Sequence, residues 1–469
     1  MGQLRRSRPP GRMMTQARAT DGDTRRHVLI VGAGFAGLWA AQALRGKGMR
    51  VTLLDRQNYH TFLPLLYQVA AAELGPTEIA YPVRAVLRRN SDVDFRMGEL
   101  RSVDPRRRRV STDQEELSYD DLILAMGATT NYFGVEGAEE RAFPLRTMDE
   151  AVPLRHHILS RFERAVHEED PELRRRLLTF TIVGGGATGV EFSGALAELV
   201  HGPLQRDYPT LNLDRGKGGC VRILLLEAMD QLLGGMPGKL ADYARDRLEE
   251  RGVEVRLETP VSAVADDGVV LEGGERILSD TVVWTGGVQG APGPADWGLP
   301  TDGLGRVRVR PTLEVEGFDG IWVAGDLAYL EDEEGRPLPG VAPVAIQQGS
   351  HVARNLEMRA RGDALKPFRY KDPGMLAVVG RNAAVARVAG RSFKGFPAWI
   401  LWLLIHVAKL IGFRNRLLVL VNWAWNYIFP KRAVRLILPD GRASTPQPGV
   451  RKEAEGVERA ESFTHGTIP

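Results

Sequence analysis

The chain has 469 residues, of which 43% are hydrophobic and 52 are glycine, which suits an α/β protein of two or three domains with many tight turns. Its net charge is only +3, so the composition gives no support for nucleic-acid binding. The single cysteine, Cys220, can form neither an internal disulfide nor a C-x-x-C pair, which excludes a dithiol–disulfide active site. We also predict no metal site.

Both ends of the chain are predicted to lie outside the folded part. Residues 1–26 are rich in arginine and contain no apolar stretch of the length that a secretory signal needs, so we expect a disordered extension. An organellar transit peptide is the alternative for this segment. Residues 441–469 are polar and interrupted by proline and glycine, which is typical of a flexible tail.

A glycine-rich loop follows the first predicted strand, residues 27–31. Its glycines Gly32, Gly34 and Gly37 have the G-x-G-x-x-G spacing that lets a chain turn tightly, approach a pyrophosphate and pack a helix against the strand. Asp55 ends the next predicted strand at close to the expected distance of about 20 residues, where a carboxylate accepts hydrogen bonds from ribose hydroxyls. This unit therefore predicts a dinucleotide site.

A second loop of the same spacing follows the predicted strand 179–183, so the chain is predicted to hold two dinucleotides at once. Its glycines are Gly184, Gly186 and Gly189. The corresponding carboxylate is Glu227, at the end of the next apolar strand. It lies farther from the loop than usual, and we interpret the excess as a connecting loop over residues 201–219, which contain several prolines and glycines. A carboxylate at this position would repel a 2′-phosphate, which favours NADH over NADPH.

Two further glycine turns indicate which dinucleotide binds at which glycine loop. Gly127 follows the predicted buried strand 121–125, and Gly325 with Asp326 follows the predicted strand 320–324. The second turn resembles the motif by which flavoproteins with two dinucleotide domains bind the ribityl chain of FAD. We therefore assign FAD to the first glycine loop and a nicotinamide nucleotide to the second.

These assignments predict an α/β fold with two Rossmann-like dinucleotide-binding domains of the glutathione-reductase type, in which the NAD domain interrupts a discontinuous FAD domain. The expected domains are a FAD domain of residues 27–145 and 300–372, an NADH-binding domain of residues 146–299, and a C-terminal membrane-associated domain of residues 373–440.

Residues 395–429 contain two apolar stretches of about 13 residues each, shorter than the roughly 20 residues of a membrane-spanning helix. Lys409, Arg414 and Arg416 lie where the stretches meet, and four tryptophans flank them, a residue type that settles at the level of lipid headgroups. We predict an amphipathic helical hairpin that lies in the membrane interface. The alternative is a buried hairpin that covers a domain or forms a dimer contact.

With these features the chain resembles the type II NADH:quinone oxidoreductases, single-subunit flavoenzymes of respiratory membranes. The most specific matching segments are residues 55–70 (DRQNYHTFLPLLYQVA), 184–191, 324–326, 345–349 and 412–416. The resemblance implies that hydride passes from NADH to FAD and two electrons pass on to a membrane quinone, without proton pumping. It also implies a monotopic protein on the cytoplasmic face of a bacterial inner membrane, and a homodimer is a further expectation.

The same resemblance proposes site residues. Gln68 would lie near the isoalloxazine ring. Glu191 is placed on the first helical turn after the second loop, where the helix dipole favours its ionised form, and it would position the nicotinamide or handle protons for the quinone. Gln347 and Gln348 match glutamines of the quinone-site helix, and we rank Gln347 first. Pro343 departs from the family pattern, because many members have glutamine there.

Other functions remain open at this point. A sulfide:quinone oxidoreductase shares the architecture but needs redox cysteines, which one cysteine does not supply. The sequence contains no feature that distinguishes a quinone reductase with an antioxidant or quinone-pool-maintenance role from a respiratory enzyme. From another class, the chain fits a FAD- and NADH-bound redox sensor similar to apoptosis-inducing-factor-type flavoproteins, in which binding matters more than turnover.

Overall fold

The computed structural model describes residues 24–88, 92–214, 219–429 and 435–437. All of them belong to one compact unit. The predicted tail 441–469 lies outside the described residues, as does the predicted extension 1–26 except for its last three residues.

The first sheet carries the first glycine loop at its centre. Its strands are β1 (His27–Val31), β2 (Arg50–Asp55), β5 (Val93–Met97), β9 (Asp121–Leu124) and β21 (Ile321–Val323), in the order β21-β9-β1-β2-β5. Every neighbouring pair is parallel. The inner strands β1 and β9 are buried along their whole length, whereas the edge strand β5 alternates buried and exposed residues. Since β21 lies far along the chain from the other four strands, this sheet is built from two separate segments, as predicted.

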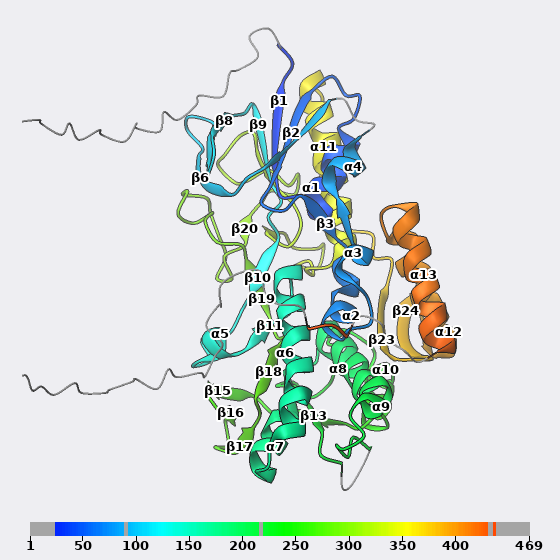
Figure 1. Cartoon of the computed structure of the whole chain (residues 1–469). Helices are drawn as coiled ribbons and strands as arrows, with labels where there is room; N and C mark the ends of the chain where they lie inside the picture. Colours follow the sequence, from blue (N-terminus) through cyan, green and yellow to red (C-terminus); the bar gives the residue numbers. More distant parts are fainter. Residues whose placement is uncertain (1–23, 89–91, 215–218, 430–434, 438–469) are drawn as a thin grey trace, which may run out of the picture. The chain divides into compact units, whose positions relative to one another are not determined.

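Two helices pack closely beside the first glycine loop (Figure 1). They are α1 (Phe35–Ala43), which follows the loop, and α11 (Ala342–Arg361), which comes from the second segment of this half. A Cβ on Gly349 of α11 would lie 2.1 Å from the carbonyl oxygen of Ala36, so only glycine permits this approach. The close packing fixes the predicted quinone-site helix against the first glycine loop.

The second sheet repeats the arrangement of the first. Its strands are β11 (Phe143–Pro144), β12 (Thr179–Val183), β13 (Arg222–Leu226), β14 (Val253–Arg256) and β18 (Thr281–Trp284), in the order β11-β18-β12-β13-β14 with all pairs parallel. The glycine-loop strand is again central, and the strand that ends at the carboxylate lies next to it. Helix α8 (Ala187–Leu199) follows the second loop.

The predicted loop 201–219 is wrong in its first part. Helix α8 continues into a π-helical turn, η2 (Val200–Leu204), and a short helix, α9 (Gln205–Asp207). Pro203 lies inside this π-helical turn and donates no backbone hydrogen bond there. The long spacing to Glu227 therefore arises from an extended helix followed by a loop.

The two halves are joined by the antiparallel pair β10 (Ala128–Thr130) and β19 (Val288–Gly290) and by the long helix α6 (Met148–His167). Thr147 and Glu150 form a capping box at the start of α6. Smaller elements complete the body: β3 (Tyr59–Thr61), η1 (Leu63–Leu65), α2 (Leu66–Ala70), α3 (Pro76–Ile79), β4 (Ala80–Pro82), α4 (Val83–Leu87), β6 (Leu100–Asp104), β7 (Arg109–Thr112), β8 (Glu116–Ser118), α5 (Ala138–Arg141), α7 (Pro171–Leu177), α10 (Gly238–Glu249), β15 (Val261–Ala265), β16 (Gly268–Leu271), β17 (Arg276–Leu278), β20 (Val307–Arg308) and β22 (Ala328–Tyr329).

The C-terminal part consists of a small sheet and a helical hairpin. An antiparallel sheet, which the sequence did not predict, is formed by β23 (Met375–Gly380), β24 (Ala383–Val388) and β25 (Arg391–Gly395). The hairpin consists of α12 (Phe396–Lys409) and α13 (Phe413–Ile428), drawn in orange in Figure 1. Within the described ranges, no helix combines the length and the apolar character needed to cross a membrane.

Candidate functional site

Both glycine loops have a backbone that only glycine can adopt. Gly32 has φ +105°, and a Cβ there would lie 2.3 Å from the carbonyl oxygen of Ala125. Gly184 has φ +108° in the second loop. The third glycines, Gly37 and Gly189, would place a Cβ 1.8 and 1.9 Å from the carbonyl oxygen of the first glycine of their own loop. The tight turn and the close helix packing of the fingerprint are therefore present twice.

The middle glycines differ from the others because open space lies above them. Gly34 and Gly186 are the N-caps of α1 and α8, and neither helix start has a side-chain cap. A Cβ on either glycine would meet no protein atom within 4 Å. Free N–H groups at an uncapped helix start attract a phosphate, and the lack of a side chain lets it approach. The residues of both loops thus fit a pyrophosphate.

Each predicted ribose carboxylate lies directly against its own glycine loop. Asp55 Oδ2 accepts a hydrogen bond from the N–H of Ala33 at 2.6 Å, and Glu227 Oε2 accepts one from the N–H of Gly185 at 2.5 Å. Burial raises the pKa of Asp55 above its ordinary value, although its hydrogen bonds to backbone N–H groups act in the opposite direction. The equivalent contacts show that Glu227 occupies the position in the second sheet that Asp55 occupies in the first.

The turn after β21 meets the end of β9 at the carboxyl edge of the first sheet. Gly325 has φ +81° and donates its N–H to Oε1 of Gln348 at 2.7 Å. Asp326 pairs with Arg146 at 3.1 Å, and Gly127, with φ +74°, follows β9. Gln348 is 1% exposed, so its side chain holds the glycine turn in place. The structure thus joins Gln348 to the predicted flavin turn.

Gln347 is held by a different part of the chain. Its Nε2 donates to the carbonyl oxygen of Lys371 at 2.9 Å, and its Oε1 accepts from the N–H of the same residue at 3.0 Å. Both ends of the amide are therefore already engaged by one backbone unit. A quinone contact at Gln347 stays a prediction, and it would require a shared or exchanged hydrogen bond.

Glu191 is buried, and the prediction that it lies in the first helical turn is wrong. Helix α8 begins at Ala187, which places Glu191 in its second turn. Burial raises its pKa to about 8, although the N–H of Val378 and the indole N–H of Trp402 both donate to Oε1, at 3.1 and 3.2 Å. Desolvation outweighs both hydrogen bonds and the helix dipole.

Two tryptophans of the hairpin form hydrogen bonds with residues of the predicted site. Trp402 of α12 donates to Glu191, and Trp423 of α13 donates to Oε1 of Gln68 at 3.0 Å. The Nε2 of Gln68 in turn donates to the hydroxyl of Tyr67 at 2.9 Å. The two indole rings lie 5.6 Å apart between centroids. Glu191, Gln68 and the inner face of the hairpin therefore form one continuous cluster of hydrogen bonds and ring contacts.

Sequence reasoning missed the role of these two tryptophans. It placed all four tryptophans of the hairpin at the headgroup level, whereas Trp402 is 1% exposed and Trp425 is 55% exposed. Trp402 lies 211 residues after Glu191, and no spacing rule relates them. An available signal was the helical period, because Ala398 and His406, one turn before and after Trp402, share its face.

Two Rossmann-like sheets, each with a glycine loop open to a pyrophosphate and a carboxylate against it, define an oxidoreductase with two nucleotide sites. Among the described residues, no group of three His, Cys, Asp or Glu side chains is placed to hold a metal ion. The family model described as pyridine nucleotide-disulphide oxidoreductase matches residues 26–349, and the NDH2 C-terminal domain matches residues 373–432.

The comparisons with individual proteins define the family more narrowly. The chain is 36% identical over 447 residues to the type II NADH:quinone oxidoreductase Ndh of Mycobacterium tuberculosis, covering 92% of this chain and 94% of that protein. It is 32% identical over 384 residues to the Staphylococcus aureus type II NADH:quinone oxidoreductase, covering 80% and 92%. The chain belongs to the type II NADH:quinone oxidoreductases, which confirms the predicted family.

A solved structure supports the fold. NDH2 from Plasmodium falciparum, in complex with NADH, superimposes with a TM-score of 0.80 at 17% identity, covering 89% of this chain and all of the other. The predicted α/β fold class with two dinucleotide-binding domains is therefore confirmed.

Proposed function

We propose that this protein oxidises NADH with a bound FAD and passes two electrons to a membrane quinone without pumping protons. The observation that carries the proposal is the contact between Glu191, on the helix of the second glycine loop, and Trp402, on the hairpin. It joins the nucleotide half to the segment predicted to meet lipid. Purified protein should be yellow and should oxidise NADH with short-chain quinones, and liposomes should increase turnover with long-chain quinones. A colourless protein, or one that NADH does not bleach, would contradict the proposal.

We assign FAD to the first glycine loop and NADH to the second. Gly34 and the start of α1 would hold the FAD pyrophosphate, with Asp55 at its ribose, while Gly186, the start of α8 and Glu227 would hold NADH. FAD, when bound, supplies the hydride acceptor and the electron donor to quinone. The protein supplies placement and a buried proton site at Glu191.

The domain assignment follows the same division. We assign residues 27–145 and 300–372 to the FAD domain and residues 146–299 to the NADH domain. This assignment is supported by β21, which completes the first sheet, and by β12, β13, β14 and β18 of the second sheet, which lie between residues 179 and 284. The short edge strand β11 joins the second sheet from just before the assigned boundary. A homodimer stays a prediction.

Glu227 is expected to select NADH over NADPH. Replacing it with glutamine removes a negative charge from the place where a 2′-phosphate would lie, while keeping one oxygen to accept the N–H of Gly185. The ratio of kcat/KM for NADPH to that for NADH should rise at least about tenfold, the equivalent of roughly 1.4 kcal/mol of relieved repulsion. Steady-state kinetics with both nucleotides measures this ratio. An unchanged ratio would show that the nicotinamide nucleotide lies elsewhere.

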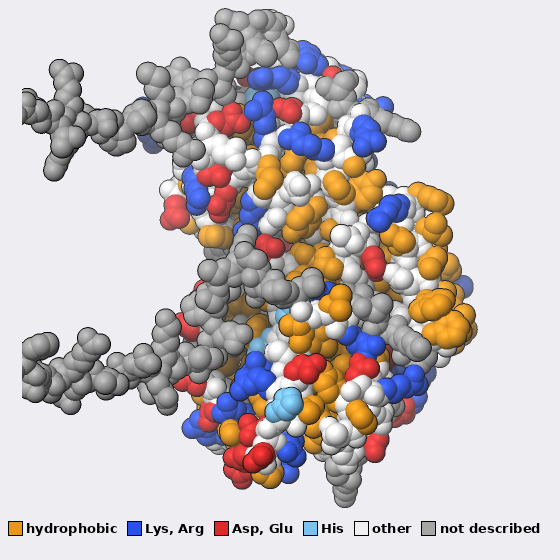
Figure 2. Space-filling model, in the orientation of Figure 1, with side chains coloured by type: hydrophobic (Ala, Val, Ile, Leu, Met, Phe, Trp, Pro, Cys, Tyr) orange, Lys and Arg blue, Asp and Glu red, His pale blue; other side chains and the backbone are white. Residues whose placement is uncertain are grey.

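We propose that the hairpin rests on the cytoplasmic surface of a bacterial inner membrane. Figure 2 shows hydrophobic side chains gathered over α12 and α13 at the edge of the molecule. Leu404 is 65% exposed, Phe413 81% and Ile428 67%, an extent of apolar exposure that water disfavours. Lys409 and Arg414 lie on or beside the turn, where they would meet lipid phosphates.

Replacing Leu404 with aspartate should weaken binding to vesicles. The exposed leucine would transfer from water to the lipid interface, and losing that transfer costs about 1.5–3 kcal/mol, or roughly tenfold to a hundredfold in partitioning. Co-sedimentation with liposomes measures the bound fraction. Leu173→Asp is the matched control, because Leu173 is 41% exposed on α7, away from the hairpin. Equal loss in both variants would argue against a membrane face on the hairpin.

A further inference from the structure

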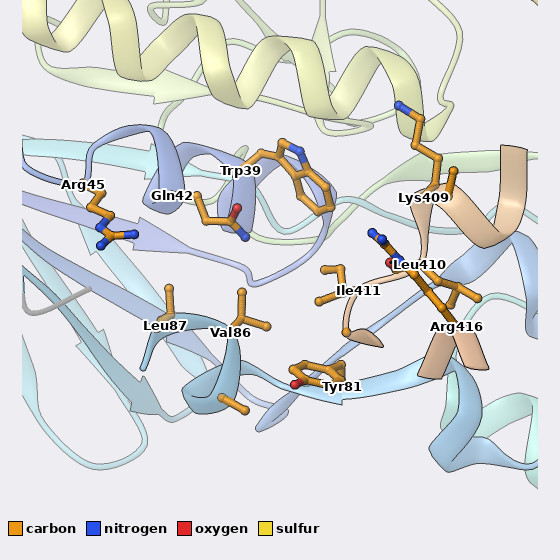
Figure 3. Close-up of a pocket in the computed structure, with 13 residues that line it drawn as sticks. Trp39, Gln42, Arg45, Tyr81, Val86, Leu87, Lys409, Leu410, Ile411 and Arg416 are labelled. Atoms are coloured by element: carbon orange, nitrogen blue, oxygen red, sulfur yellow. Dashed lines mark hydrogen bonds between the residues drawn. The ribbon is translucent and has the colours of Figure 1, made fainter. Parts of the chain in front are cut away.

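A cavity of about 530 Å³ lies where the turn between α12 and α13 meets the FAD half of the chain. It is separate from both glycine loops. Its walls come from three places: Trp39 and Gln42 on α1, Tyr81 and Val86 on β4 and α4, and Ile411 in the hairpin turn. In Figure 3 these side chains face a shared space, which is lined by both apolar and polar groups.

The charged residues that line the cavity are all cations. They are Arg45, Lys409 and Arg416, and no aspartate or glutamate lines it. None of the three forms an ion pair within the part of the chain that the structure describes. Arg416 donates its Nε to the carbonyl oxygen of Leu410 at 2.8 Å, and its two terminal nitrogens have no acceptor among the described residues. In Figure 3 its guanidinium lies beside Ile411 at the edge of the cavity.

The start of α13 adds a second positive element at the same edge. Gly412, which lines the cavity, is the N-cap of this 16-residue helix, and no side chain caps it. The first N–H groups of α13 and the positive end of its dipole therefore favour an anion beside Arg416.

The turn that carries these groups is fixed against the body. Gly412 has φ +86°, and a Cβ there would lie 2.4 Å from the ring of Tyr81, so the turn packs flat on that ring. Asn415 is 2% exposed and donates to the carbonyl oxygen of Ala80 at 3.1 Å. Because of these contacts, the segment 412–416 holds Arg416 at the mouth of a preformed cavity.

We propose that this cavity binds one anionic phospholipid, with its phosphate between Arg416 and the start of α13 and its glycerol and first acyl carbons against Trp39, Val86 and Ile411. The inference rests on the proposed membrane contact of the hairpin. Continuity with that surface favours a lipid over a free anion, since Phe413 and Leu417, which are 81% and 50% exposed, begin the apolar face in the same turn. The bound lipid would anchor the hairpin turn to the FAD half.

The test uses the full chain with FAD bound and a short-chain phosphatidylglycerol below its micelle concentration, measured by isothermal titration calorimetry. Arg416→Gln should raise the dissociation constant at least about tenfold, because it removes a charge-assisted contact. Arg391→Gln is the matched control, since Arg391 has the same charge and is exposed on β25 but does not line the cavity. It should leave the dissociation constant within about twofold. Gln42→Glu, an exposed substitution on α1, should weaken binding without altering the turn.

Three results would overturn the lipid assignment. Equal weakening by Arg416→Gln and Arg391→Gln would mean general attraction to a cationic surface. If short-chain phosphatidylcholine binds as tightly as phosphatidylglycerol, and Gln42→Glu changes neither affinity, the cavity does not select for an anionic headgroup. Inorganic phosphate bound as tightly as the lipid would make it a free-anion site. Failure of the wild-type protein to sediment with any vesicle would instead contradict the membrane contact itself, so the two proposals fail separately.

Discussion

Glu191→Gln should slow the reoxidation of reduced protein by quinone by about 10²–10⁴-fold, the usual contribution of a positioned acid or base. Reduction by NADH should change far less. The reason is that Glu191 is the buried acid of the cluster that joins α8 to the hairpin, and its pKa of about 8 keeps a proton on the carboxyl at neutral pH. Glutamine keeps the shape and an acceptor oxygen for Val378 and Trp402 but cannot release a proton. Stopped-flow absorbance of the flavin measures each half-reaction separately.

The pH dependence follows from the direction of the pKa shift. Below about pH 8 the wild-type carboxyl is protonated and can donate, and above it the anion predominates. The quinone half-reaction of the wild type should therefore fall about tenfold per pH unit above 8, while the slow rate of Glu191→Gln should stay flat. Glu198→Gln, on the same helix, serves as the control and should keep the wild-type profile. A wild-type profile retained in Glu191→Gln would remove Glu191 from proton handling.

The raised pKa also predicts a stability effect with a definite sign. The folded chain keeps the Glu191 proton up to about pH 8, whereas an unfolded glutamate loses it near its ordinary value of 4.5. Between those two values the folded state binds more protons, so the contribution of this group to stability decreases as the pH rises. Thermal unfolding of wild type and Glu191→Gln across this window should therefore diverge, with the variant less sensitive to pH.

Gly34→Ala and Gly186→Ala should each produce a folded protein that has lost one nucleotide. Both positions have an ordinary negative φ, and an added Cβ meets no protein atom within 4 Å, so the chain itself tolerates alanine. The methyl group would occupy the space above an uncapped helix start where a pyrophosphate approaches. Gly34→Ala should purify with little flavin, and Gly186→Ala should keep its flavin but bind NADH about a hundredfold more weakly, or roughly 2.7 kcal/mol.

Flavin absorbance and NADH titration distinguish the two variants, and circular dichroism reports whether they fold. Gly202→Ala is the control, because a Cβ there also meets nothing within 4 Å and the residue lies in η2, away from both loops. The reversed pattern, with flavin lost from Gly186→Ala, would exchange the two sites. Unchanged binding in both variants would show that the middle glycines do not face a phosphate.

The sequence predicted best the features that depend on local backbone geometry. The two glycine loops need only a strand, a tight turn and a helix, and the ends of parallel strands meet at one edge, so Asp55 and Glu227 were found by position alone. Glu227 was recognised despite its long spacing, because the intervening residues add length without moving the strand.

The features that depend on burial by distant segments were not predictable in the same way. The location of Glu191 followed from the second loop, but its protonation depends on β23 and Trp402, which come much later in the chain. The dipole of helix α8, considered alone, favours an ionised Glu191, and it does not include burial by segments far away in the sequence. The inward-facing tryptophans were misplaced for a related reason: an apolar hairpin has two apolar faces here, one for the protein and one exposed.

The hydrogen bond between Trp402 and Glu191 limits how a water-soluble version of this protein can be engineered. Deleting the residues after 395 would remove the exposed apolar surface of the hairpin. It would also let water reach the Glu191 carboxyl and lower its pKa towards the ordinary value. Truncated material would then misreport the pH behaviour of the intact chain and mislead inhibitor screening. Solubilising substitutions confined to the outward positions of the hairpin, such as Leu404 and Ile428, would leave that acid in its native surroundings.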